Sequence, residues 1–246
     1  MTQRVSVIMP SLNMGGFLDD ALRSLSEQGL PVHEVILVDG GSTDQTFEVV
    51  ELHRANGLPI RVVDHPNRGP GAARNQGIAC ASGDLIAFLD PDDLWPAGKL
   101  GRQLGRLAAQ PAVDMVSGYV CYFETAAGLA PAPGSRTERL FHVHVGACIY
   151  RREVFERIGG AFDEDLLYAE DVDLLQRVRE HRVPFTILRS VELYYRQHAA
   201  SMMSAQHPRK QSDFRLAAHK SLRRRRAAGT LATPLPDFIH FLEPVS

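Results

Sequence analysis

The sequence predicts an α/β fold built on a mostly parallel central sheet. In the first 110 residues, short runs rich in β-branched residues alternate with amphipathic stretches, and this alternation is typical of βαβ units. Each apolar run is followed by a short stretch rich in Gly, Asn, Asp or Arg, as expected where strands end in loops. The chain of 246 residues, 44% of them hydrophobic, is long and apolar enough for a conventional core.

Four strands and four helices are expected in this first part. The strands are predicted at 5–10, 34–40, 60–65 and 85–90 from their apolar, β-branched composition. Helices are predicted between and after them, where apolar residues recur at helical spacing. The helical signals are Phe17, Leu18, Ala21, Leu22 and Leu25, then residues 44–56, then 71–82, and then Leu100, Leu104 and Leu107.

The second half has a less regular pattern. Residues 114–124 and 185–198 are predicted to be strands, and a helix is expected over about 169–181. The Ala, Pro and Gly content of residues 125–135 predicts a mobile loop. No internal repeat is present in the sequence.

Bulk properties exclude several classes of protein. The formal charge of −2 gives no global reason to bind nucleic acid or an anionic membrane. The cysteines Cys80, Cys121 and Cys148 are widely spaced in apolar stretches, which predicts reduced core residues. Without a signal-like start or 18 consecutive apolar residues, we expect a cytoplasmic protein, and peripheral association with the inner face of the membrane stays open.

The four strand ends are predicted to outline one polar cleft, because ligands bind at the carboxyl ends of strands in an open parallel sheet. At the second end, Ser42 and Gln45 match a capping box, which explains the serine without a ligand. Asp39, the last residue of a core strand, is placed to accept hydrogen bonds from a ligand. The helix dipole nearly accounts for Asp44.

The third strand end is rich in glycine and arginine. Gly69 and Gly71 have G-x-G spacing, but Arg74 occupies the place of the third small residue, which counts against a nicotinamide dinucleotide site. A helix opening at Gly71 could bind a phosphate with Arg68 or Arg74 as counter-charge. Equally, Arg74 and Asn75 could be structural residues of the cleft edge.

The fourth strand ends in three carboxylates, Asp90, Asp92 and Asp93. Carboxylates at D-x-D spacing are hard oxygen ligands suited to Mg²⁺ or Mn²⁺ that also contacts substrate phosphates. The alternative is a turn in which Pro91 fixes φ and Asp93 caps the next helix. Because the other strand ends are also polar, we favour the metal site.

Taken together, these stretches resemble family 2 glycosyltransferases, enzymes with a single GT-A domain. The matching residues are VSVIMPSLN, VILVDGGSTDQT, NRGPGAARNQGI and IAFLDPDD, in the family's order and at about its spacing. The segment from Gly146 to Val178 resembles the family's acceptor side, with its Glu-Asp pair at Glu170 and Asp171. The resemblance covers roughly residues 4 to 200.

The resemblance implies a fold, a reaction and site residues. The implied reaction is an inverting transfer from a nucleotide-sugar donor, most often a UDP-sugar, to a carbohydrate or lipid-linked sugar acceptor, as in cell-surface polysaccharide or glycoconjugate synthesis. It implies a GT-A domain over 1–204, with a nucleotide-binding half (1–110) and an acceptor half (111–204), followed by a basic helical extension over 205–246. The implied nucleotide-binding residues are Pro10, Ser11, Asn13, Asp39, Arg68, Gly69, Arg74 and Asp90.

The resemblance also implies the chemistry. Asp92 or Asp93 would be the principal ligand of Mn²⁺ or Mg²⁺, with His198 as a further candidate. Asp171, beside Glu170, would be the base that accepts the acceptor hydroxyl proton, since the helix start favours its ionised form. Without the resemblance, both acids would be explained by the preference of acidic residues for helix N-termini.

Two other functions remain as alternatives. One is a non-catalytic subunit that binds nucleotide sugars, which the intact acidic residues disfavour. The other is a nucleotide-dependent oxidoreductase or methyltransferase, disfavoured by the incomplete glycine pattern. The sequence names neither the sugar, within the hexosyl or N-acetylhexosaminyl class expected, nor the acceptor or the oligomeric state.

Overall fold

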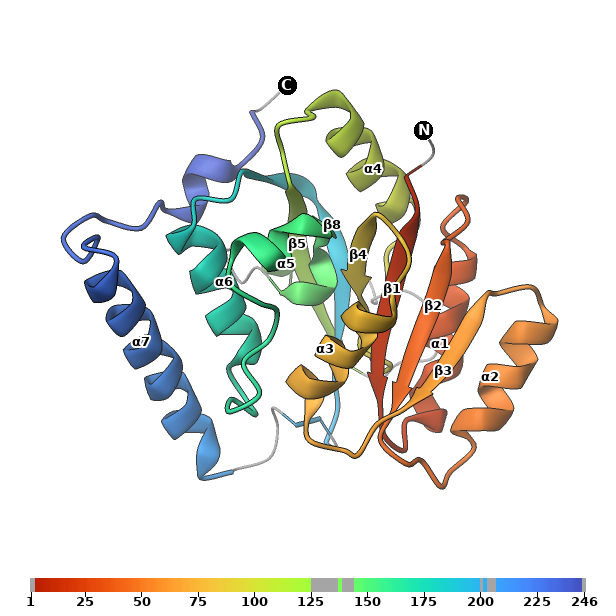
Figure 1. Cartoon of the computed structure of the whole chain (residues 1–246). Helices are drawn as coiled ribbons and strands as arrows, with labels where there is room; N and C mark the ends of the chain where they lie inside the picture. Colours follow the sequence, from red (N-terminus) through yellow and green to blue (C-terminus); the bar gives the residue numbers. More distant parts are fainter. Residues whose placement is uncertain (1–2, 125–136, 139–143, 200, 203–206, 245–246) are drawn as a thin grey trace.

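A mixed sheet of eight strands runs through the described part of the chain, in the order β3-β2-β1-β4-β7-β5-β6 with β8 beside β5 (Figure 1). The structure is a computed structural model that describes residues 3–124, 137–138, 144–199, 201–202 and 207–244. The first four strands are mutually parallel, so the predicted α/β fold with a mostly parallel sheet is confirmed. Their bounds are β1 (Val5–Ser11), β2 (Glu34–Asp39), β3 (Ile60–Asp64) and β4 (Leu85–Phe88).

The second half of the chain extends the same sheet. β7 pairs antiparallel with both β4 and β5, and so joins the two halves into one sheet. The strands predicted at 114–124 and 185–198 are both present, and β5 and β8 pair in parallel. The predicted loop at 125–135 lies outside the described residues. The remaining strands are β5 (Met115–Glu124), β6 (Thr137–Glu138), β7 (Ile149–Arg151) and β8 (Phe185–Gln197).

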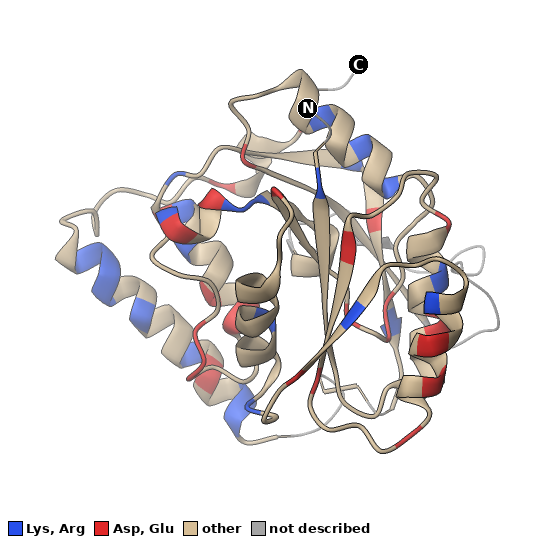
Figure 2. Ribbon diagram, turned by 45° about the vertical axis from the view of Figure 1, so that its right-hand side comes forward, with Lys and Arg blue, Asp and Glu red and all other residues tan. Residues whose placement is uncertain are grey.

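Helices cover both faces of the sheet (Figure 1). The helices predicted after each of the first four strands are present, as is the one predicted near 169–181. The basic C-terminal stretch forms a long helix beside α6, with Lys and Arg along its length (Figure 2). The helices are α1 (Gly15–Ser26), α2 (Thr46–Ala55), α3 (Pro70–Cys80), α4 (Lys99–Ala109), α5 (Glu153–Arg157), α6 (Glu170–Glu180) and α7 (Arg209–Ala227), with 3₁₀ turns η1 (Val145–Ala147) and η2 (Phe238–Phe241).

Alternation of side chains along the strands produces two apolar layers, one on each face of the sheet. On β1, Val7 and Met9 point into the layer that packs against α1, α2 and α4. Ile8, between them, points into the layer that packs against α3, α5 and α6. Cys121 and Cys148 are buried as predicted, whereas Cys80, also predicted to be a core residue, is only partly buried.

A close contact at Gly77 fixes the distance between α3 and the sheet. A Cβ atom added at Gly77 would overlap the side chain of Ile8 on β1, so only glycine lets the helix lie this near the strand. Arg74 lies one turn earlier on α3, and the close packing therefore sets its height above the carboxyl ends of the strands.

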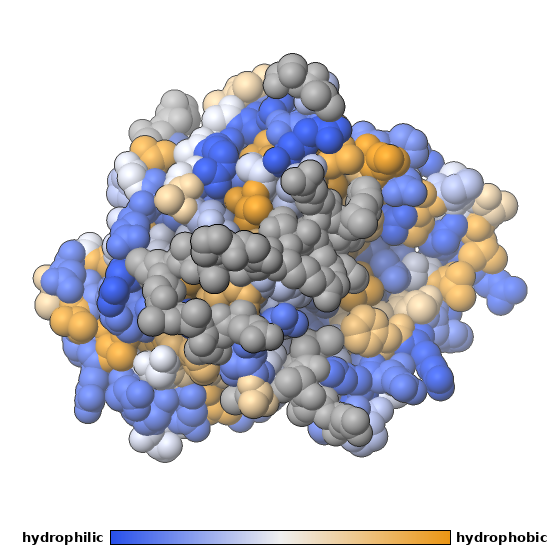
Figure 3. All heavy atoms as spheres, turned by 180° about the vertical axis from the view of Figure 1, so that it is seen from behind, coloured by the Kyte–Doolittle hydropathy of each residue, from blue (hydrophilic) through white to orange (hydrophobic). Residues whose placement is uncertain are grey.

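The outer surface is mixed. On the back of the molecule, apolar side chains form separate patches among hydrophilic ones (Figure 3). Among the described residues, the helices are too short or too polar to cross a bilayer.

A buried lysine gives the fold a predicted pH dependence. Lys99 is fully buried; its Nζ donates to Gln103 Oε1 at 2.8 Å and lies 4.3 Å from the centre of the Trp95 ring. Burial lowers the pKa of Lys99 from 10.5 to about 8. Between these two values the unfolded chain binds more protons than the folded one, so the stability contribution of this group rises with pH.

We therefore expect the Lys99→Met variant to lack part of the wild-type response to pH. Relative to that variant, the free energy of unfolding of the wild type should rise by about 1 kcal/mol per pH unit between about pH 8 and 10. Urea unfolding curves for both proteins across this range measure the difference. Parallel pH profiles would show that Lys99 titrates normally.

Candidate active site

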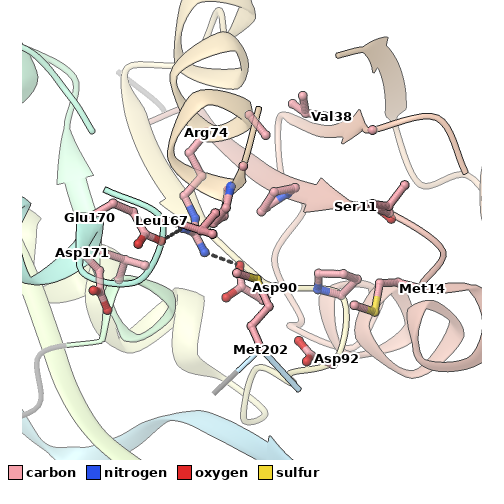
Figure 4. A pocket seen from close by; sticks show the side chains of 18 of the residues that line it. Ser11, Met14, Val38, Arg74, Asp90, Asp92, Leu167, Glu170, Asp171 and Met202 are labelled. Atoms are coloured by element: carbon pink, nitrogen blue, oxygen red, sulfur yellow. Dashed lines mark hydrogen bonds and ion pairs between the residues drawn. The ribbon is translucent and has the colours of Figure 1, made fainter. Parts of the chain in front are cut away.

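A pocket with a volume of about 360 Å³ opens at the carboxyl ends of β1, β2, β3 and β4 (Figure 4). One side of it is formed by these strand ends, and the other by the segment that enters α6, by β8 and by residues near η1. The pocket is where the four polar strand ends were predicted to meet. Of the predicted site residues, those that line it are Pro10, Ser11, Gly69, Arg74, Asp90, Asp92, Glu170 and Asp171.

Arg74 forms ion pairs with two carboxyl groups of this pocket. It is 4% exposed, and its guanidinium donates to Asp90 Oδ1 at 2.7 Å and to Glu170 Oε1 at 2.8 Å (Figure 4). Because Asp90 follows β4 and Glu170 begins α6, one buried cation ties the end of β4 to the start of α6. This arrangement matches the structural interpretation of Arg74, and leaves its role toward a phosphate as a prediction.

These ion pairs set the protonation of the two carboxyl groups. Burial alone would raise the pKa of Asp90, but the charge of Arg74 outweighs it and holds that pKa below its usual value. Burial raises the pKa of Glu170 to about 7, against the opposing effect of Arg74. Two carboxyl groups that share one guanidinium therefore differ in protonation near neutral pH.

Gly69 determines how α3 enters the site. It is the N-cap of α3 with φ +100°, a conformation that favours glycine, and Pro70 follows it at the first helical position. A Cβ at this position would lie 3.0 Å from Leu167 Cδ1 on the opposite wall. Arg68, in contrast, points to the surface, where it pairs with Glu164 at 2.9 Å.

The acidic turn after β4 concentrates negative charge. Asp93 is 1% exposed; its Oδ1 accepts a hydrogen bond from the Arg196 backbone N–H at 2.9 Å, while its Oδ2 has no partner among the described residues. Burial and the charges of Asp92 and Asp90 raise the pKa of Asp93 well above its usual range. Burial and the charge of Asp90 also raise the pKa of Asp92.

A divalent cation fits this turn. A buried carboxylate oxygen without a partner in the described part of the chain, next to two further carboxylates, is a donor set typical of hard cations. The residues that bring ligand atoms within 4.8 Å of one another are Asp90, Asp93 and His144. The sequence-based candidates were Asp92, Asp93 and His198. Of these, His198 has its Nε2 3.0 Å from Asp92 Oδ2, and its ring is tilted against that of Phe17 with ring centres 4.4 Å apart.

His144 has a preferred tautomer. Its Nδ1 accepts the backbone N–H of Gly146 at 3.2 Å, so the neutral ring carries its proton on Nε2. Burial lowers the pKa of His144, which favours the neutral ring. In this tautomer His144 is a hydrogen-bond donor to the pocket, and it could bind a metal at Nε2 only by losing the bond from Gly146.

Asp39 and Asn13 shape the loop after β2. Asp39 is buried, and its carboxylate accepts hydrogen bonds from the backbone N–H groups of Gly41 and Ser42, each at 2.8 Å, and from the Ser42 hydroxyl. The Asn13 side chain accepts from Thr43 N at 2.8 Å. The pocket wall here is formed by Val38 and Gly40, on either side of Asp39.

The predicted capping box is wrong. Helix α2 begins at Thr46, and its N-cap Gln45 makes no side-chain capping hydrogen bond; the N–H of Thr46 is instead accepted by Asp44 Oδ1 at 3.1 Å. Ser42 is instead held by Asp39 and accepts the Asn13 N–H at 2.8 Å. Asp44 also does more than respond to a helix dipole: its carboxylate accepts from Gly15 N at 2.9 Å and so joins the start of α1 to α2.

Asp171, the second residue of α6, lines the pocket. Its Oδ1 accepts the Val172 N–H at 2.7 Å. Figure 4 shows Asp171 and Asp92 on opposite sides of the pocket, with Asp90 between them. The pocket therefore holds two carboxyl groups, those of Glu170 and Asp171, apart from the acidic turn.

Sequence reasoning missed several pocket residues. His65, which was not predicted, lines the pocket with a buried Nε2 that has no hydrogen-bond partner among the described residues, as does the Oγ of Ser11, which was predicted. The position of His65 at a strand end was the available signal, since it follows β3 directly. His144 and Tyr195 had no such signal. The other unassigned lining residues include Asn67, Leu167, Tyr168, Ser201 and Met202.

The fold is that of known GT-A glycosyltransferases. Staphylococcus aureus TarS, solved with UDP-GlcNAc, matches with a TM-score of 0.71 at 24% identity, over 89% of this chain and 66% of that one. The mannosyltransferase PcManGT from Pyrobaculum calidifontis, solved with GDP-Man and Mn²⁺, matches with a TM-score of 0.63 at 22% identity, over 96% and 66%. The fold and its acidic cleft thus place the protein in the GT-A class.

The family model named "Glycosyl transferase family 2" matches residues 6–159. The chain therefore belongs to glycosyltransferase family 2, as its motifs predicted.

Relatives at higher identity are also named as glycosyltransferases. The uncharacterized glycosyltransferase EpsJ of Bacillus subtilis is 34% identical over 191 residues, which are 70% of this chain and 54% of EpsJ. Glycosyltransferase TuaG of the same organism, named for teichuronic acid biosynthesis, is 36% identical over 116 residues, 47% of this chain and 46% of TuaG. The chain spans about half the length of these relatives.

Proposed function

We propose that this protein transfers a sugar from a nucleoside-diphosphate sugar to an acceptor hydroxyl, with inversion at the anomeric carbon. The observation that carries this proposal is that acidic groups lie on opposite sides of the pocket. The acidic turn lies on one side, and Asp171 lies on the other (Figure 4). Inverting transfer by direct displacement needs this arrangement, because the leaving diphosphate and the attacking hydroxyl occupy opposite faces of the sugar.

The ends of β1, β2 and β3 are the proposed nucleoside subsite. Ser11 Oγ and His65 Nε2, which lack partners among the described residues, can bond a base there, between the apolar surfaces of Pro10 and Val38. A carboxylate has about four acceptor sites, and Asp39 uses three of them in its loop. A base N–H could take the fourth. The complexes of TarS with UDP-GlcNAc and with UDP support UDP as the nucleotide.

The diphosphate is proposed to lie between the acidic turn and the start of α3. Mn²⁺ or Mg²⁺ held by Asp92 and Asp93, with Asp90 beside them, would neutralise charge on the leaving group. Gly69 and Pro70, at the start of α3, line the same pocket, where the positive end of the helix dipole would favour a phosphate. His144 can donate its Nε2–H to a phosphate or sugar oxygen. Mn²⁺ in the PcManGT complex supports a divalent ion.

Asp171 is the proposed base. It accepts the proton of the acceptor hydroxyl as the oxygen attacks the anomeric carbon, and the nucleoside diphosphate leaves with the electron pair of the broken glycosidic bond. The acceptor, a carbohydrate or a lipid-linked sugar in this proposal, would approach along the wall made by Leu167 and Tyr168. The name of TuaG supports a role in the synthesis of a surface polysaccharide.

A donor screen tests the proposal. The protein is incubated with UDP-, GDP- and dTDP-sugars and an acceptor mixture, with Mn²⁺ or with EDTA, and released nucleotide and product mass are measured. We expect release from a UDP-sugar only when Mn²⁺ is present, and NMR of the product should show inversion. Tight binding of UDP with Mn²⁺ but no turnover of any donor would favour the non-catalytic alternative.

The cation site has its own test. We expect Asp92→Ala to weaken Mn²⁺-dependent binding of UDP by at least about tenfold, because a ligand worth more than about 1.4 kcal/mol is removed. Isothermal titration calorimetry with and without Mn²⁺ measures this.

Asp44→Ala is the matched control for the cation site. Asp44 caps the start of α1 through Gly15, so its loss should lower stability by about 1 kcal/mol and leave binding intact. Unchanged Mn²⁺-dependent binding in Asp92→Ala would contradict the metal assignment.

A further inference from the structure

The segment over 163–169 controls the acceptor side of the pocket. It connects α5 to α6, contains no helix or strand, and leads directly into Glu170 and Asp171. Its residues Leu167 and Tyr168 line the pocket. Backbone N–H groups in such a segment have no partners in a helix or sheet, so their hydrogen bonds must come from elsewhere.

Asp213 supplies these hydrogen bonds. It projects from α7 and is 3% exposed. Its Oδ2 accepts the backbone N–H of Leu167 at 2.9 Å and that of Tyr168 at 3.3 Å. A buried carboxylate is stable only where hydrogen bonds or cations compensate its lost hydration. The two backbone N–H groups, together with Arg209 at 3.7 Å from Oδ1, are that compensation.

Further contacts bind the same segment to α7. Lys220 pairs with Asp163 and Asp165. Arg209 donates to the backbone carbonyl of Asp165 at 2.9 Å. Between these polar contacts, Ala217 packs against Leu166 and Ala169 in a small apolar cluster of its own. Helix α7 therefore contacts the segment along its whole length, from Asp163 to Ala169.

The start of the segment is fixed independently by α3. The Asn75 side chain donates to the Phe162 carbonyl at 2.9 Å and accepts the Phe162 N–H at 2.8 Å. Asn75 of α3 thus holds the chain at Phe162. Asp213 of α7 holds it at Leu167 and Tyr168. The backbone beyond Tyr168 has little freedom, because Ala169 is the N-cap of α6 and Asp171 is two residues further on.

We propose that Asp213 is a positioning residue for the transfer reaction: its hydrogen bonds to Leu167 and Tyr168 fix the wall of the acceptor subsite and the place of Asp171. This inference rests on the proposed function, but the hydrogen bonds can be tested without it. It also makes α7 part of the acceptor side of the active site. A misplacement of about 1 Å in a reacting group can lower a rate about 100-fold.

Amide hydrogen exchange tests the positioning directly. In Asp213→Asn the carboxylate charge is lost, and exchange at the Leu167 and Tyr168 amides should be at least about tenfold faster than in the wild type. The amides of Phe162 and of α6 beyond its first turn should exchange as before. Equal exchange at Leu167 and Tyr168 in both proteins would overturn the proposal, whatever reaction the protein catalyses.

Kinetics then separate positioning from a general loss of stability. We expect Asp213→Asn to lower kcat by roughly 10- to 100-fold, with KM for the donor changed less than about twofold, because the nucleoside subsite rests on β1, β2 and β3. Asp213→Glu, which keeps the charge, should recover part of kcat.

Ser221→Ala is the matched control. Ser221 is a buried residue of α7 that donates to Glu180 at the far end of α6. Its loss should lower Tm without changing kcat. If Ser221→Ala lowers kcat as much as Asp213→Asn does at equal Tm, the effect is one of stability and the proposal is overturned. If the wild type transfers no sugar, the proposed function fails, and the exchange measurement alone decides the role of Asp213.

Discussion

Replacing Asp171 with asparagine is expected to lower kcat for sugar transfer by about 10²- to 10⁴-fold, the usual contribution of a positioned general base. Asparagine has the same shape but cannot accept the hydroxyl proton. Binding of UDP with Mn²⁺ should change less than about twofold, because Asp171 lies across the pocket from the acidic turn (Figure 4). Steady-state transfer rates and calorimetric binding to the same preparations measure the two effects.

Asp64→Asn provides the isosteric control for this experiment. Asp64 ends β3 and is exposed, and it is not among the described residues that line the pocket. Its replacement should leave both kcat and nucleotide affinity as in the wild type. If Asp171→Asn keeps more than about a tenth of wild-type kcat, another group must accept the proton and Asp171 loses its assigned role.

Replacing Arg74 with methionine should have the largest effect on stability. Methionine has a similar length but no charge, so Asp90 and Glu170 would lose their shared partner inside the protein. Removing one member of a buried ion pair costs about 3–5 kcal/mol, a large part of the roughly 5–15 kcal/mol that stabilises a typical domain. Urea unfolding at pH 7 measures the loss, and nucleotide binding should weaken with it.

The pH dependence of this loss has a definite sign. The pKa of Glu170 is about 7 when folded, above its ordinary value of 4.5, so the folded protein holds this proton more tightly and its contribution to stability falls as pH rises from 4.5 to 7. The pKa of Asp90 is lowered chiefly by Arg74, against the effect of burial, so this carboxylate contributes stability above its ordinary pKa. Without Arg74 both groups would take up protons more readily.

The penalty of Arg74→Met should therefore be smaller at pH 5 than at pH 7.5. The double variant Arg74→Met with Glu170→Gln removes one of the stranded charges and should recover part of the stability at pH 7.5. A penalty that is equal at both pH values, with no recovery in the double variant, would show that the two carboxylates do not depend on this guanidinium.

The elements that could be predicted from the sequence are those that local patterns of apolar residues specify. The four N-terminal strands and their helices follow from apolar periodicity, and parallel pairing then brings their ends together. The clustering of Ser11, Arg74 and Asp90 around one pocket is a consequence of that topology and needs no knowledge of side-chain contacts.

Contacts between distant residues could not be predicted in this way. Arg74 and Glu170 are 96 residues apart, and nothing near Arg74 in the sequence indicates that its partner begins α6. The capping box failed for a similar reason: Ser42 had a local partner in Gln45, but Asp39 and the Asn13 N–H compete for its hydroxyl and hold it. A single histidine such as His144 has no spacing pattern at all.

The buried guanidinium between Asp90 and Glu170 has a consequence for how molecules enter and leave the cleft. Hinge-like opening that moved β4 away from α6 would strand a cation and two anions in a setting that hydrates them poorly, so such wide excursions are rare at neutral pH. Molecules would then enter and leave through small rearrangements of residues that line the pocket, such as Met202. The width of the cleft is therefore fixed by the ion pairs of Arg74 with Asp90 and Glu170.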